Sequence, residues 1–79
     1  MEIEIEDKLK EIYKNIKIKV EYEDIRKYNI YTTIEKDGIG YESKILYKYD
    51  NYLTMDSNIA NIREIINRII ISFYERKEY

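Results

Sequence analysis

The chain has 79 residues, among them 10 tyrosines, and contains no histidine, cysteine, tryptophan or proline. The missing histidine and cysteine remove the usual general base, thiol nucleophiles and transition-metal ligands, so we expect no catalysis, no cofactor and no metal site. A net charge of -2, from 14 basic and 16 acidic side chains, is not typical of a nucleic-acid-binding protein.

The N-terminal sequence and the apolar runs bear on where the protein acts. The run "IINRIIISF" (65–73) contains an arginine and is shorter than the ~20 residues that cross a bilayer. The start "MEIEIEDKLK" is acidic where a signal peptide is basic. We therefore expect a single domain (1–79) in the cytoplasm, of the host cell if the protein is viral, without membrane contact.

A first amphipathic helix is predicted to begin near Glu4. Acidic residues, Glu4 and Asp7 among them, occupy its first turn, where the helix dipole favours negative charge. The alternation in "MEIEIE" also fits a strand, so residues 1–3 receive no prediction. The apolar stripe follows helical spacing: Ile5, Leu9, Ile12, Tyr13 and Ile16.

After the helix, apolar residues occur at every second position, a pattern that is typical of half-buried strands. The first strand is predicted in "IKIKVEYE" (16–23), followed by a turn over 24–27. In "TIEKDGIGYES", the pair Asp37-Gly38 predicts a type I′ hairpin that places Lys36 opposite Ile39. The predicted inward-facing pairs are Ile34/Tyr41, Thr32/Ser43, Ile30/Ile45 and Tyr28/Tyr47, joined to the first strand by Val20/Ile30 and Tyr22/Tyr28.

A second helix is predicted from Asp56 or Ser57, either of which is a suitable N-cap, with Arg76 and Lys77 in its last turn. Ile71 lies away from the apolar stripe and is expected to be exposed. Helix, three-stranded antiparallel meander and helix predict an α+β two-layer sandwich. The stripe consists of Ile59, Ile62, Ile66, Ile69, Ile70 and Phe73, widened by Ile65.

Apart from Tyr13 of the first helix, the tyrosines divide into two groups. Five share the spacing of the inward-facing residues and are expected to rim the core: Tyr22, Tyr28, Tyr41, Tyr47 and Tyr49. Four others are candidate contact residues, since tyrosine is enriched at interfaces: Tyr31 on the open sheet face, Tyr52 in the last connection, and Tyr74 and Tyr79 near the C-terminus.

The candidate partner-binding residues combine these exposed tyrosines with carboxylates. Ile71 and Tyr74 could form a small apolar contact for a partner or a second copy. The full set is Glu4, Asp7, Tyr31, Asp50, Tyr52, Asp56, Glu64, Ile71 and Tyr74.

The element order resembles that of double-stranded RNA-binding domains, which implies an alternative function in nucleic-acid binding. That family carries a basic cluster at the start of its second helix, where this chain reads "DSNIANIRE". The order also resembles HicA-type toxins, which act through a histidine that is absent here. On the nucleic-acid hypothesis the phosphate-binding side chains are Lys17, Lys19, Lys44 and Lys48, beside Tyr31.

The layout also resembles small phage-borne inhibitors of CRISPR nucleases, through its leading helix, a hairpin such as "KDGI" (36–39) and a helical end. Those inhibitors occupy a basic nucleic-acid site of a larger protein with carboxylates. The resemblance implies a non-catalytic protein-binding module, an inhibitor or accessory factor of viral or mobile-element type. Its partner would be a larger protein, such as a nucleic-acid-binding effector. A small structural homodimer is a further alternative.

Overall fold

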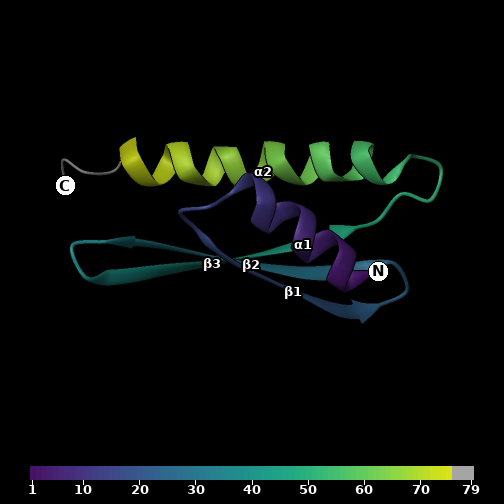
Figure 1. Ribbon diagram of the computed structural model, residues 1–79, viewed down its shortest axis with the longest axis horizontal. Helices are drawn as coiled ribbons and strands as arrows, with labels where there is room; N and C mark the ends of the chain where they lie inside the picture. Colours follow the sequence, from purple (N-terminus) through teal and green to yellow (C-terminus); the bar gives the residue numbers. More distant parts are fainter. Residues whose placement is uncertain (76–79) are drawn as a thin grey trace.

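The computed structural model describes residues 1–75, and the chain folds as helix, three strands and helix. The strands form one antiparallel sheet in the order β1-β2-β3, and the helices pack on one face of it (Figure 1). The predicted α+β two-layer arrangement is thereby confirmed. The elements are α1 (Glu2–Ile12), β1 (Lys17–Asp24), β2 (Lys27–Lys36), β3 (Ile39–Lys48) and α2 (Met55–Glu75).

The hairpin between β2 and β3 has the predicted register. Asp37 and Gly38 have φ angles of 56° and 79°, and a type I′ turn requires positive φ at both positions. Lys36 pairs with Ile39, and every predicted pair between β2 and β3 follows from it. The pairs that join β1 to β2 are also as predicted. A local turn signal therefore determines which side chains face the helices.

The core lies between the inner face of the sheet and the two helices. Ile30 at the centre of β2 is fully buried, as are Ile5 of α1 and Ile62 of α2. Each such burial contributes about 1.5–3 kcal/mol. The stripe predicted on α2 is confirmed, because Ile59, Ile62 and Ile66 are buried and the remaining members are half-buried.

The first helix differs from the prediction at both ends. It begins at Glu2, two residues early, and ends at Ile12, whose side chain is exposed. The backbone is already extended at Tyr13, because the chain must turn back there to start β1. Tyr13 and Ile16 therefore pack from the connection, and the Tyr13 hydroxyl donates to Asn67 Oδ1 of α2 at 2.7 Å.

The N-cap of the second helix was predicted wrongly. The helix begins at Met55, and the hydroxyl oxygen of Thr54 accepts a hydrogen bond from the Ser57 amide at 3.1 Å. Thr54 is thus the cap, while Asp56 and Ser57 lie inside the first turn. The predicted contact residue Tyr79 lies outside the described residues, as do Arg76 and Lys77.

Five tyrosines were predicted to lie at the edge of the core, and this prediction is only partly correct. Tyr28, Tyr47 and Tyr49 are buried, and burial raises the pKa of the Tyr28 hydroxyl. Tyr22 and Tyr41 are about half exposed, at 53% and 47%, because they lie near opposite ends of the sheet. Each still packs edge-on against one aromatic ring, of Tyr28 and Phe73 respectively.

Candidate protein-interaction surface

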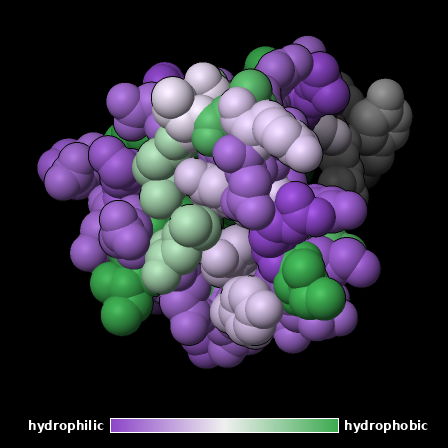
Figure 2. Space-filling model, turned by 90° about the vertical axis from the view of Figure 1, so that its right-hand side faces the viewer, coloured by the Kyte–Doolittle hydropathy of each residue, from purple (hydrophilic) through white to green (hydrophobic). Residues whose placement is uncertain are grey.

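Exposed apolar side chains gather at one end of the molecule. Here α1 begins, β1 turns into β2, and β3 leads to α2 (Figure 1). Figure 2 looks onto this end, where green apolar residues stand among purple polar ones. We call this set the loop-end surface: Met1, Ile3, Tyr22, Ile25, Tyr52 and Leu53, all exposed.

Hydrogen bonds hold the segments of the loop-end surface together. The Tyr49 amide, before the last connection, donates to the Arg26 carbonyl in the β1–β2 turn at 2.6 Å. The Tyr22 amide donates to Glu2 of α1 at 2.9 Å. Lys8 of α1 lies 3.7 Å from Asp56 of α2. The surface is therefore built on fixed backbone.

The β1–β2 turn presents an isoleucine to solvent. The Asp24 carboxylate accepts a hydrogen bond from the Ile25 amide at 2.7 Å, and Arg26 adopts a left-handed φ of 57°. This tight reversal leaves the Ile25 side chain 69% exposed. The sequence analysis missed this residue, although an apolar side chain within the polar turn "EDIRK" was the available signal.

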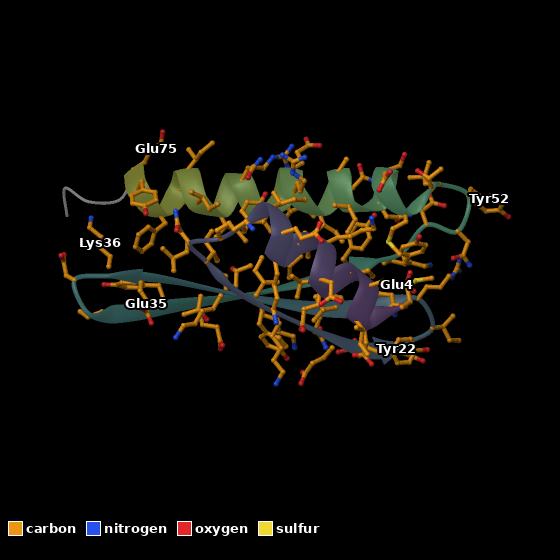
Figure 3. All side chains as sticks on the ribbon, in the orientation of Figure 1. Glu4, Tyr22, Glu35, Lys36, Tyr52 and Glu75 are labelled. Carbon is orange, nitrogen blue, oxygen red and sulfur yellow. The ribbon has the colours of Figure 1, made fainter. Side chains whose placement is uncertain are left out.

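The connection between β3 and α2 presents a tyrosine in the same way. The Asp50 carboxylate accepts a hydrogen bond from the Tyr52 amide at 2.9 Å, which is an Asx-turn. The Asp50 amide in turn donates to the side chain of Asn58 at 2.9 Å. The loop is thus fixed, and Tyr52 projects from it with 96% of its surface exposed (Figure 3).

Asn58 fixes this connection from inside the protein. It is fully buried in α2, and its Oδ1 accepts hydrogen bonds from the Tyr47 hydroxyl at 2.7 Å and the Asp50 amide. Its Nδ2 donates to the carbonyls of Asp50 and Thr54 at 3.0 and 2.9 Å. One side chain therefore joins the end of β3, the loop and the start of α2.

The predicted contact residues do not form a single patch. Figure 3 shows Glu4 and Tyr52 at the same end of the molecule. Four predicted residues belong to the segments of this end: Glu4, Asp50, Tyr52 and Asp56, with Asp7 one helical turn further along α1.

The other predicted contact residues lie elsewhere. Tyr31 is half-buried in β2 on the open sheet face, and Glu64 is 2.8 Å from Arg68 on α2. Ile71 and Tyr74 are exposed, as predicted, but lie in the last turns of α2, at the far end from Tyr52.

The open face of the sheet carries lysines that are partly neutralised. Tyr31 lies between Lys19 and Lys44 in the strand pairing. Lys19 is 3.1 Å from Glu21, whose hydrogen bond raises the pKa of the ammonium group. Lys17 is 3.2 Å from Glu35. Two of the four candidate phosphate-binding lysines therefore already have acidic neighbours.

A groove runs between the β2–β3 hairpin and the second half of α2. Tyr41 and Ile39 line it from the hairpin, and Ile69 and Phe73 line it from the helix. The Lys36 ammonium lies 5.9 Å from the centre of the Phe73 ring. This hollow, lined by apolar and polar side chains alike, lies at the opposite end of β3 from the loop-end surface.

Residues 1–75 contain no cluster of three or more carboxylates that could hold a metal ion. No helix among them is long and apolar enough to cross a membrane. No protein-family model, curated protein or solved structure matches the chain.

Proposed function

We propose that the protein is a non-catalytic binding module that attaches to a larger protein through the loop-end surface. One observation carries this proposal: apolar side chains from separate segments are exposed together on hydrogen-bonded backbone. Ordered aromatic and aliphatic side chains are the usual anchors of protein interfaces. A preformed surface also loses little conformational freedom on binding.

The charges near this surface suggest the kind of partner. The carboxylate of Asp24 stands at the end of β1, that of Asp50 stands in the connection to α2, and Glu4 lies in the first turn of α1. Arg26 and Lys27 stand close to Asp24, but the three carboxylates still favour a partner with basic residues around an apolar pocket. This chemistry agrees with an inhibitor or accessory factor that occupies the basic nucleic-acid site of an effector. Tyr52 is the side chain best placed to enter a pocket.

The experiment compares two double variants that are matched in residue type. Ile25→Glu with Tyr52→Ala alters the loop-end surface, whereas Ile71→Glu with Tyr74→Ala alters an equally apolar pair at the far end of α2. Tagged proteins are purified from the cells that encode them, and bound proteins are quantified by mass spectrometry. We expect a stoichiometric partner with the wild type and the control variant, and its loss with the loop-end variant.

Two results would contradict the proposal. In one, the wild type retains no protein at a stoichiometric level. In the other, both double variants retain the partner equally. Circular dichroism of all three proteins ensures that the comparison concerns folded chains.

Nucleic-acid binding has less support, because Lys17 and Lys19 are paired with glutamates. Its signature would be a gel shift of duplex RNA that weakens with salt and is lost in Lys44→Glu.

A further inference from the structure

The two edges of the sheet differ. At the β1 edge, carboxylates from α1 accept hydrogen bonds from outward-facing backbone amides. Glu6 binds the Val20 amide at 2.7 Å, and Glu2 binds the Tyr22 amide at 2.9 Å. A further strand could pair here only by displacing α1.

The β3 edge has no such cover. In a two-residue hairpin Ile39 exchanges both of its hydrogen bonds with Lys36, and the pattern alternates along the strand. The backbone groups of Gly40, Glu42 and Lys44 therefore point away from the sheet. No side chain among residues 1–75 binds them as Glu2 and Glu6 bind β1. An unpaired edge of this kind is a template for another strand.

The first half of β3 is also exposed on its inner face. Ile39 and Tyr41 are 55% and 47% exposed, whereas Ile18 and Val20 of β1 are buried. The groove beside α2 lies next to these residues and adds the partly buried Phe73. A strand added at this edge would therefore gain apolar contacts as well as backbone hydrogen bonds.

We propose that a second copy of this chain occupies the β3 edge, with the two β3 strands antiparallel and Ser43 on the two-fold axis. In this register, residues whose backbone groups point away from the sheet lie opposite residues of the same kind in the second copy. Glu42 of each copy lies opposite Lys44 of the other, so two pairs of opposite charge form. Such directly opposed pairs stabilise a sheet, and like charges in these positions destabilise it.

Neighbouring registers are less favourable. An axis at Lys44 places two lysines opposite each other, and an axis at Glu42 places two glutamates opposite each other. An axis at Ile45 brings Glu42 opposite Lys48, but it leaves Ile39 without a partner. The Ser43 register pairs the whole exposed half of β3, with Tyr41 opposite Ile45 of the second copy.

The dimer would join the three strands of each copy into one continuous sheet. Because the axis is perpendicular to the sheet, the helices of both copies lie on the same face. The loop-end surfaces point in opposite directions and stay free. This contact does not involve Ile71 and Tyr74, the pair considered for a dimer contact from the sequence.

A single cysteine tests the register, because the chain has none of its own. Ser43 would face its copy as a non-hydrogen-bonded pair, with Cα atoms about 4.5 Å apart, within disulfide range. Under mild oxidation we expect Ser43→Cys to form a covalent dimer. Ser57 is exposed in the first turn of α2, and the control variant Ser57→Cys should remain monomeric. Equal cross-linking of both variants, or none of Ser43→Cys, overturns the inference.

Charge exchange gives an independent test by light scattering. Glu42→Lys and Lys44→Glu each place like charges opposite one another, so each variant should be monomeric. Mixed together they again oppose glutamate to lysine, and the dimer mass should return. Ile71→Glu should remain dimeric. A monomeric wild type, or dimers of both single variants, would show that β3 does not pair in this way.

Discussion

Replacing Asn58 with alanine should destabilise the protein strongly, because this fully buried side chain forms four hydrogen bonds, one of them buried and three partly buried. Each such bond contributes about 1 kcal/mol net, and the Tyr47 hydroxyl is left in the buried part of the site. Alanine recovers about 0.5 kcal/mol through its better helix propensity. We expect a net loss of about 3 kcal/mol, a large share of the ~4–12 kcal/mol typical of a domain this size.

The measurement is urea unfolding followed by far-ultraviolet circular dichroism. Asn61→Ala is the control, because Asn61 is exposed and its amide is 3.5 Å from the Tyr47 hydroxyl. It should change the free energy of unfolding by less than about 0.5 kcal/mol. Tyr47→Phe should lower the free energy of unfolding by about 1 kcal/mol in the wild type. It should lower it by less in the Asn58→Ala background, where the hydrogen bond between the two side chains is already lost.

A loss below about 1 kcal/mol in Asn58→Ala would refute this reasoning, since it would mean that the four bonds are replaced by others. Equal effects of Tyr47→Phe in both backgrounds would refute the coupling between the two side chains.

The remaining predictions concern the turn, the covered edge and the core. Gly38→Ala should cost about 1 kcal/mol because of its φ of 79°, whereas Gly40→Ala, whose added Cβ would lie 3.4 Å from Thr33, should be nearly neutral in the same unfolding assay. The Val20 amide lowers the pKa of Glu6 below 4.5, so this stabilisation is present above pH 4.5 and is lost as the pH falls through the folded-state pKa. Melting temperatures should therefore fall in acid less steeply for Glu6→Gln than for the wild type; equal slopes would contradict this. Ile66→Ala should cost about 3 kcal/mol, and a cost below about 1 kcal/mol would mean that its site collapses fully.

The meander was predictable from the sequence because its signals are local. Asp37-Gly38 determines the turn, and alternation then determines the face of every residue in β2 and β3. The start of α1 was not predictable, because "MEIEIE" fits both helix and strand spacing. Nor was the cap of α2, since Thr54, Asp56 and Ser57 are all suitable and the tertiary contacts of Asn58 favour Thr54.

The candidate surface could be predicted only in part, for a different reason. Tyr52 was recognisable because it stands alone in a connection. Ile25 and Ile3 are far from it in sequence, and only the folded chain brings their segments to the same end. The exposure of Tyr41 also depends on tertiary structure, because this residue lies near the end of β3, an edge strand of the sheet.

The covered β1 edge has a consequence for assembly. A molecule that pairs through β3 has no second free edge to offer, so growth by strand addition stops after one step. Chains with two open edges can instead extend without limit into fibrils. In the proposed dimer, α1, held in place by the buried Ile5 and Leu9, would therefore block further strand addition at the β1 edge.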